Sequence, residues 1–329
     1  MSRHSVLHGF LTAFAGALAW GACGAAGGAA ADYPTRPIRL VIPFAAGGGA
    51  DTLARILSPK LTADLGQQWV VDNRGGAAGN LAAEIVAGAN PDGHTVLMGF
   101  STVLTVNPSL YKLRHNVQKD FQPVTLLATA QYILVVHSSV QAGSVQELID
   151  LAKSKPGVLN YASAGVGSPL HLAAELFKKR AGVQMVHIPY KGGGPAAVAV
   201  VGGEAQVIFG SVASSMAHAR AGRLRALATT GMKRSKVAPE LPTIAESGFP
   251  GFDVRSWYAL LVPSKTPIAI VNRIHDAAVR AVRLPDVEKA MARQGLEPET
   301  STPRGLAARI KQETSGWAAV IKDAGIRAE

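Results

Sequence analysis

The segment IRLVIPFAAGGGADTLARIL, residues 38–57, decides the fold because it joins a strand to a helix through three consecutive glycines. Ile38 to Ile42 is a short apolar run rich in β-branched residues, as a buried strand requires. A helical pattern begins after Asp51 and Thr52, which are candidate caps. The glycine-rich turn therefore directs several N–H groups at one spot at the start of a helix, which predicts an anion site.

A glycine-rich turn can also be no more than a tight connection, so this loop needs support from elsewhere in the chain. It is not a Walker loop, because no Lys-Ser/Thr pair follows the glycines. It is not a dinucleotide fingerprint either, because Gly47-x-Gly49-x-x is completed by Thr52 rather than by Gly or Ala. Two further glycine-rich loops supply the support.

The second loop, Ser163-Ala-Gly-Val-Gly-Ser-Pro-Leu-His171, also lies between a strand pattern and a helix pattern. Ser168 suits the capping position, and Pro169 suits the first helical turn. The third loop, Lys191-Gly-Gly-Gly-Pro195, enters a helix in the same way. Because ligands of open α/β sheets bind beyond the carboxyl ends of strands, the three loops predict a cleft lined by backbone donors, which suits a carboxylate.

Residues 1–31 have the composition of a secretory signal peptide. A polar start containing Arg3 precedes a mostly apolar run from Val6 to Trp20, and small residues follow up to Ala31. The run is short for a membrane span, so we expect export, cleavage and a periplasmic protein. Cys23, the only cysteine, lies in this segment. Lipid attachment there is the less favoured alternative, because Trp20 stands where a lipoprotein signal normally has Leu.

The remaining chain is basic but carries no nucleic-acid signature. Without residues 1–31, 33 − 1 = 32 Lys and Arg face 22 Asp and Glu, a net charge of +10. This favours anionic partners, yet the basic residues are scattered singly and lack interleaved aromatics. With 48% hydrophobic residues the chain should fold compactly, and its length suits two domains. No cysteine is left for a metal site, and we expect neither a metal nor another cofactor.

Strand and helix patterns alternate along the chain, which predicts an α/β fold. Between residues 38 and 101 the order strand, helix, strand, helix, strand predicts a parallel, doubly wound sheet. A second alternating set begins with the strand pattern Tyr132–His137. From Trp257 the chain returns to the first domain, with a strand to Val262 and then three helices that begin near Thr266, Pro285 and Pro303.

Ser168 and His171 lie three residues apart at a helix start and raise the alternative of a nucleophile–base pair. No Gly-x-Ser-x-Gly elbow surrounds Ser168, and a capping Ser followed by a packing His is commoner. His187, in a strand beside Pro189, is interpreted as structural. The carboxylates form no Asp-x-Asp or Glu-x-x-His group, so we assign no catalytic residue and no metal ligand.

A series of motifs runs in order through the chain from Tyr33 onward. They are Tyr33-Pro-Thr-Arg-Pro-Ile38, Pro43-Phe-Ala-Ala-Gly-Gly-Gly-Ala-Asp51, Asp72-Asn-Arg74, Asp92-Gly93, Asn160-Tyr-Ala-Ser-Ala-Gly-Val-Gly-Ser168 with His171 and Glu175, Pro189-Tyr-Lys-Gly192 with Pro195-Ala196, Ala221-Gly-Arg-Leu-Arg-Ala-Leu227, Leu241-Pro-Thr243, Gly248-x-Pro-Gly-Phe252 and Ser256-Trp-Tyr258. With these motifs in this order and spacing, the chain from Asp32 to its end resembles the Bug family of solute-binding proteins, the extracytoplasmic component of tripartite tricarboxylate transporters.

The resemblance implies a two-lobed, Venus-flytrap fold of the type II periplasmic binding class, with a doubly wound sheet in each lobe. We expect lobe 1 to comprise residues 32–127 and 253–329, and lobe 2 residues 128–252. In relatives, the loops matching Phe44–Asp51 and Ser163–Ser168 act as pincers on a ligand carboxylate. The chain departs from the family pattern at Gly75, where proline is usual, and at Ala199 and Gly210, where many relatives carry Asp. The last two bear on the choice of ligand.

The resulting hypothesis is a non-catalytic, monomeric protein that captures a small carboxylate and delivers it to a membrane permease. The ligand class includes dicarboxylates, tricarboxylates, amino acids and aromatic acids. An extracytoplasmic hydrolase or isomerase and the ligand-binding subunit of a sensor remain alternatives. We expect the N–H groups of Gly47–Ala50 and Ala164–Ser168 to hold the carboxylate, with the Lys191 ammonium solvated at the rim. The candidate ligand-binding residues are Phe44, Ala46, Gly47, Gly48, Asp51, Ser101, Ser163, Gly165, Gly167, Ser168, His171, Tyr190, Lys191, Gly192, Ser211 and Tyr258.

Overall fold

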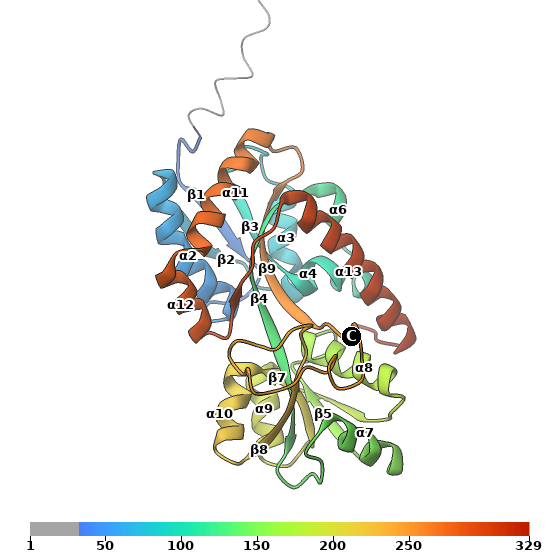
Figure 1. The fold of residues 1–329 in the computed structure, drawn as a ribbon. Coiled ribbons are helices and arrows are strands. Elements are labelled where there is room, and N and C mark those ends of the chain that lie inside the picture. Colours follow the sequence, from blue (N-terminus) through green and yellow to red (C-terminus); the bar gives the residue numbers. More distant parts are fainter. Residues whose placement is uncertain (1–32, 329) are drawn as a thin grey trace, which may run out of the picture. The chain divides into compact units, whose positions relative to one another are not determined.

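The computed structural model describes residues 33–328, and strands and helices alternate along them (Figure 1). The expected signal peptide, residues 1–31, lies outside this range. The strands are β1 (Ile38–Ile42), β2 (Trp69–Asn73), β3 (Thr95–Phe100), β4 (Phe121–His137), β5 (Asn160–Ser163), β6 (Val186–Pro189), β7 (Val207–Ser211), β8 (Leu224–Thr229), β9 (Arg255–Pro263) and β10 (Glu297–Pro298). The helices are α2 (Gly49–Leu65), η1 (Ala77–Gly79), α3 (Asn80–Ala87), α4 (Ser101–Thr105), α5 (Asn107–Leu110), α6 (Val117–Asp120), α7 (Val145–Ser154), α8 (Pro169–Ala181), α9 (Gly193–Val201), α10 (Val212–Arg220), α11 (Ile268–Val282), α12 (Pro285–Arg293) and α13 (Pro303–Asp323).

Strands β2, β1 and β3 lie side by side in that order and run parallel, as the alternating pattern predicted. Beyond β3, strand β9 pairs antiparallel with β3, and the first half of β4 pairs antiparallel with β9. The sheet of the first lobe is therefore mixed rather than purely parallel. The two antiparallel strands are the ones that lead between the lobes.

Strands β6, β5 and β7 repeat this arrangement in the second lobe. β5 lies between the other two and runs parallel to both. The second half of β4 pairs antiparallel with β7, and β8 pairs antiparallel with β4. In each lobe the first of the three parallel strands lies between the second and the third. The loops after β1 and β5 therefore occupy equivalent positions, where the strand order reverses and open α/β sheets bind ligands.

One long strand, β4, belongs to both lobes. Its residues up to Gln131 pair with β9, and from Tyr132 onward they pair with β7 and β8. The sequence pattern predicted a strand only from Tyr132, but the strand already begins at Phe121. Pro123 lies where the register shifts, and at a bulge a proline is tolerated because no ladder N–H is needed. The expected lobe limits themselves stay predictions.

The helix limits agree closely with the sequence patterns. α2 ends at Leu65, directly before a glycine in the sequence, because Gly66 adopts a φ of 75° and closes the helix in the left-handed conformation. The sequence analysis missed the helix α10, the two-residue strand β10 and the short helices η1, α4, α5 and α6. In the first lobe α2, α11 and α12 pack together, whereas α13 packs beside α4 (Figure 1). Ile321 near the end of α13 joins Val106 and Leu172 in an apolar cluster, which links the two lobes.

Candidate ligand-binding site

The loop between β1 and α2 is fixed by a buried carboxylate. Asp51 is 4% exposed, and its Oδ2 accepts hydrogen bonds from the Gly47 N–H at 2.9 Å and from Arg55 Nε at 3.0 Å. Asn73 donates from Nδ2 to the carbonyl oxygen of Phe44 at 3.1 Å. The hydrogen bond from Arg55 lowers the pKa of Asp51, so its carboxylate stays ionised and holds the loop at neutral pH.

The helix start behind this loop offers unused backbone donors. Gly48 is the N-cap of α2, and no side chain caps it. Within residues 33–328, no hydrogen bond uses the N–H groups of Gly48, Gly49 or Ala50. These groups carry the positive end of the helix dipole, so they favour an anion. The Gly47 N–H, which was expected to contact the ligand, is donated to Asp51 instead. Ala46 lies exposed in the same loop.

Three aromatic rings pack together near the start of α2 in the first lobe. Phe44 packs edge-on against Phe100 with ring centroids 5.4 Å apart, and Phe100 lies 5.1 Å from Tyr258. Tyr258 is 8% exposed, and burial raises the pKa of its hydroxyl to about 12. The sequence analysis selected Ser101, which begins α4, but missed Phe100. The available signal was its place at the carboxyl end of a predicted strand.

Gly47, Gly48 and Gly49 are each explained by a different local constraint, or by the lack of one. Gly47 has a φ of 84°, a conformation that side chains disfavour. A Cβ at Gly49 would lie 2.6 Å from the Tyr258 hydroxyl oxygen, so only glycine lets the helix start approach the ring. A Cβ at Gly48 would meet only the Ala45 carbonyl oxygen, at 3.6 Å. Gly48 is therefore free of internal constraint, as expected where the backbone faces a ligand.

The second loop uses much of its own backbone to hold its shape. Gly165 and Gly167 have φ of 113° and 72°, which glycine adopts without strain. The Gly165 N–H donates to the Ser163 hydroxyl at 3.1 Å, and the Ser168 N–H donates to the Gly165 carbonyl oxygen at 3.2 Å. The Gly167 N–H donates to Nδ1 of His171 at 3.1 Å. These three N–H groups, which were expected to hold the carboxylate, are therefore already used.

The donors left for a ligand in this loop are the N–H groups of Ala164 and Val166. No hydrogen bond within residues 33–328 uses either of them. With the three N–H groups at the start of α2, the two loops keep five of the nine predicted backbone donors. If the two loops hold a carboxylate, these five N–H groups are the donors that remain available to it.

Two histidines stack beneath the second loop. The rings of His171 and His187 have centroids 4.0 Å apart, and Tyr161 stacks on His187 at 4.9 Å. His187 Nε2 and the Ser163 hydroxyl oxygen are 2.6 Å apart. Burial, and then repulsion by His187, lowers the pKa of His171 to about 4, and burial lowers the pKa of His187. Both rings are neutral at pH 7, as His171 must be to accept the Gly167 N–H.

The geometry argues against Ser168 and His171 as a catalytic pair. Ser168 Oγ accepts the backbone N–H of His171 at 3.3 Å and so caps α8. The Nδ1 of His171 is occupied by the Gly167 N–H, and its Nε2 lies 3.9 Å from the Glu175 carboxylate. Within residues 33–328 no hydrogen bond joins the Ser168 hydroxyl to an imidazole, and the recognised role of this serine is the cap of α8.

The third loop lies directly beside the second. The Tyr190 N–H donates to the Ser163 carbonyl oxygen at 3.0 Å, which ties the two loops together. Gly192 has a φ of 111° and leads into α9. Lys191 is exposed, and its side chain forms no ion pair with any residue in the range 33–328. Ser211 is exposed at the end of β7, on the same edge of the sheet.

The second loop reaches the first lobe through Gly167. A Cβ at Gly167 would lie 2.5 Å from Leu110 Cδ1, at the end of α5. Leu172, one turn into α8, packs with Val106 between α4 and α5. Because α4 begins at Ser101, the fold brings the second loop and the segment after β3 to one junction between the lobes. No group of three or more metal-ligating side chains occurs within residues 33–328.

The family model described as "Tripartite tricarboxylate transporter family receptor" matches residues 53–326. The chain belongs to this receptor family. A protein of Pseudomonas sp. strain P51, described as a UPF0065 protein in the tcbD–tcbE intergenic region, is 40% identical over 291 residues, 88% of this chain and 86% of that protein. Protein BugT of Bordetella pertussis is 35% identical over 297 residues, 90% of this chain and 91% of that protein.

Solved structures of similar receptors share the fold. Rpa4515 of R. palustris, solved with adipate, has a TM-score of 0.78 and 34% identity, covering 90% of this chain and 99% of that chain. MatC of Rhodopseudomonas palustris, solved with bound malate, has a TM-score of 0.74 and 32% identity, covering 88% of this chain and 100% of that chain.

These similarities confirm the Bug resemblance and the two-lobed fold class of this receptor. The family is one of periplasmic solute-binding proteins. No helix between residues 33 and 328 combines the length and the apolar composition that a membrane span requires. The roles of the individual site residues in ligand binding stay predictions.

We expect Gly49→Ala to destabilise the receptor by about 1–3 kcal/mol, because the new methyl group presses on the Tyr258 hydroxyl. In a Tyr258→Phe background the same change should cost less than about 0.5 kcal/mol, because the nearest ring carbon, Cζ, is 3.6 Å away, an ordinary contact. Denaturant unfolding of the four proteins gives the coupling between the two sites. Equal costs in both backgrounds would contradict this contact.

The lowered pKa of His171 predicts a loss of stability in acid. An unfolded histidine binds its proton near pH 6.5, whereas His171 in the fold binds it near pH 4. Stability present at pH 7 is therefore lost as the pH falls between these values, by on the order of 3 kcal/mol from this group. The lowered pKa of His187 acts in the same direction.

Denaturant unfolding at pH 7 and pH 4.5 measures this loss. His171→Asn is the matched variant, because its amide oxygen can still accept the Gly167 N–H without titrating. We expect the variant to lose distinctly less stability between the two pH values than the unchanged receptor. An identical loss would mean that other groups govern the acid response.

Proposed function

We propose that this receptor is a periplasmic solute-binding protein that captures a small carboxylate between its lobes and delivers it to a tripartite tricarboxylate-type permease. The observation that carries the proposal is the start of α2, where the N–H groups of Gly48, Gly49 and Ala50 are unused near the three packed aromatic rings. An anion accepted there needs no buried cation, because the donors and the helix dipole supply the complementary charge.

The unused backbone N–H groups can account for micromolar affinity for a carboxylate. A hydrogen bond to a charged group contributes about 1.5–3 kcal/mol, and a micromolar ligand needs about 8 kcal/mol in total. Three N–H groups on the first lobe and the N–H groups of Ala164 and Val166 on the second therefore provide enough, together with apolar packing on Phe44 and Tyr258. Lys191 is exposed, and a surface charge of this kind contributes about 0–1 kcal/mol.

A dicarboxylate is our first candidate ligand. Two of the similar structures hold adipate and malate, which are both dicarboxylates. A molecule with two anionic ends also matches a protein with backbone donors on two lobes. Tricarboxylates, amino acids and aromatic acids make up the rest of the class. Ala199 and Gly210 add no charged group to the second lobe, so we expect no selection for a ligand ammonium group at these positions.

The structure favours ligand binding over catalysis, and the family favours transport over a sensor. An extracytoplasmic hydrolase or isomerase using Ser168 and His171 would need a hydroxyl–imidazole contact, and the hydroxyl caps α8 instead. We therefore propose a non-enzymatic receptor, acting as a monomer. A sensor subunit would use the same ligand site, and the two roles differ only in the membrane partner, which is a permease in the family to which this chain belongs.

Gly48→Val should abolish binding of adipate or malate, whichever is the ligand, while the receptor still folds. Gly48 has a φ of −79°, which valine adopts readily, and its side chain would cover the N–H groups at the start of α2. Titration calorimetry measures the affinity, and a thermal melt of the free variant verifies the fold. Gly165→Val should also lose binding, with added strain because φ there is 113°.

Lys191→Met is the matched control for a side-chain ion pair. We expect it to weaken binding by less than about tenfold, or ~1.4 kcal/mol. If Lys191→Met lost binding and Gly48→Val kept it, the carboxylate would be held by the ammonium group, and the assignment of the site to backbone donors would be wrong.

Export with removal of residues 1–31 is the localisation that we propose. The intact mass of the protein recovered from the periplasm should correspond to a chain beginning at Asp32. A mass that includes a diacylglyceryl group on Cys23 would show a lipid-anchored receptor instead, and an uncleaved mass would contradict the signal peptide.

A further inference from the structure

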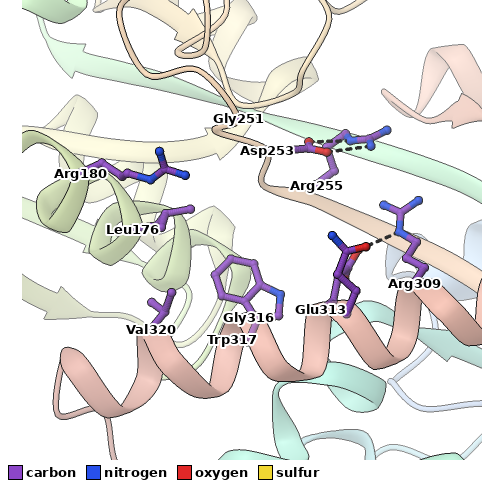
Figure 2. A pocket seen from close by; sticks show the side chains of 11 residues that line it. Leu176, Arg180, Gly251, Asp253, Arg255, Arg309, Glu313, Gly316, Trp317 and Val320 are labelled. Atoms are coloured by element: carbon purple, nitrogen blue, oxygen red, sulfur yellow. Dashed lines mark hydrogen bonds and ion pairs between the residues drawn. The ribbon is translucent and has the colours of Figure 1, made fainter.

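A second concave site lies away from the predicted ligand loops, and we call it the hinge-side pocket. Its volume is about 610 Å³, within the range of small-molecule sites. Its walls come from α8, from α13 and from the segment that leads into β9 (Figure 2). The lining residues are Leu176, Arg180, Gly251, Asp253, Arg255, Arg309, Gln312, Glu313, Gly316, Trp317 and Val320.

This pocket is separate from the site proposed above. None of the sixteen candidate ligand-binding residues lines it. Leu176 and Arg180 lie on the later turns of α8, whereas the second loop enters the first turn at Pro169. A ligand of this pocket would therefore bind at a site distinct from the glycine-rich loops.

Gly316 is the first sign that the pocket serves a ligand. Among the helices of residues 33–328 it is the one glycine in a helix interior, because the others lie in first turns or in η1. Glycine weakens a helix relative to alanine, yet a Cβ at Gly316 would meet nothing within 4 Å. Packing within the chain therefore does not require glycine there. The missing side chain leaves the backbone of α13 bare on the pocket wall.

Among the charged side chains that line the pocket, the one without an ion-pair partner in residues 33–328 is positive. Arg255 is paired with Asp253 and Glu299, and Arg309 is paired with Glu299 and Glu313. Arg180 is in no ion pair within residues 33–328, and its Nη1 donates a 3.4 Å hydrogen bond to the Pro250 carbonyl oxygen. Its guanidinium is thus the one charge lining the pocket that a ligand can pair without breaking an existing ion pair.

The pocket also offers a flat apolar surface. Figure 2 shows the ring of Trp317 on α13 facing the space that Arg180 borders from α8, with Leu176 and Val320 nearby. Trp317 is partly buried, so one part of its indole is free for contact. Aromatic faces prefer flat partners, and a guanidinium pairs well with a planar carboxylate.

We propose that the hinge-side pocket is a second binding site, which takes an aromatic carboxylate with its ring against Trp317 beside Gly316 and its carboxylate on Arg180. Because α8 belongs to the second lobe and α13 to the first, such a ligand contacts both lobes at a place other than the principal cleft. Its occupancy would then bias the arrangement of the lobes that the principal ligand requires.

Benzoate is the probe, and the indole N–H resonance of Trp317 in the ¹⁵N-labelled receptor is the readout. The chain has four tryptophans, so Trp317→Phe assigns the resonance. We expect a saturable shift with half-saturation on the order of 1 mM, and at least tenfold weaker effects from uncharged benzamide and from acetate, which lacks the ring. Arg180→Met should weaken benzoate about tenfold, and Gly316→Leu should abolish the shift.

Two controls separate this site from the principal one. Gly48→Val should leave the benzoate shift of Trp317 unchanged, and Arg180→Met should leave the binding of adipate or malate unchanged. Gly316→Ala should raise the melting temperature by about 2 °C while weakening benzoate several-fold. Loss of the proposed dicarboxylate binding alone would count against the principal site and not against this pocket.

The proposal is overturned if benzoate produces no saturable shift of Trp317, or an equal one in Arg180→Met. It is also overturned if the shift disappears in Gly48→Val, because the probe would then occupy the principal cleft. A stabilised Gly316→Ala that binds benzoate as well as the unchanged receptor would likewise show that the glycine has no part in binding.

Discussion

The continuity of β4 through both sheets is the constraint on which the rest of the structure depends. Its hydrogen bonds pass from β9 to β7 and β8 between Gln131 and Tyr132, so the lobes are joined by a paired strand rather than by a loose linker. The Tyr132 and Ser256 hydroxyls meet at this point, and Gln131 binds the backbone of Gly231 and Lys233. These contacts fix the point at which β4 passes from one sheet to the other.

The two glycine-rich loops, residues 44–51 and 163–168, are each held by a side chain that accepts one of the loop's own N–H groups. Asp51 holds its loop by accepting the Gly47 N–H, and His171 holds the second loop by accepting the Gly167 N–H. In each loop, some N–H groups are used in hydrogen bonds that hold the loop's conformation, and this fixes the directions of the N–H groups that stay unused. For the carboxylate that we propose as ligand, donors fixed in this way would need little rearrangement, so little binding free energy would be lost in ordering the site.

The hinge-side pocket and the proposed ligand loop at residues 163–168 both involve α8. This helix begins at Pro169 beside the second loop, and its later turns carry Leu176 and Arg180 into the pocket. If both proposed sites bind their ligands, α8 is the element that would connect them, because one rigid helix carries residues of both. The packing of Leu172 with Ile321 of α13 lies between the two sites and would carry a shift of α8 to the first lobe.

The sequence by itself determined the alternating elements, the three glycine-rich loops and the family, because periodicity, turn residues and motif spacing are local properties. Helix limits such as the end of α2 at Gly66 followed from the same local rules. Tertiary structure alone decided the full length of β4, the ring contact of Phe100 and the stacking of His171 on His187. It also decided which loop N–H groups stay unused and that α8 and α13 enclose a pocket. These features join residues far apart in the chain, so their partners become known only when the fold brings them together.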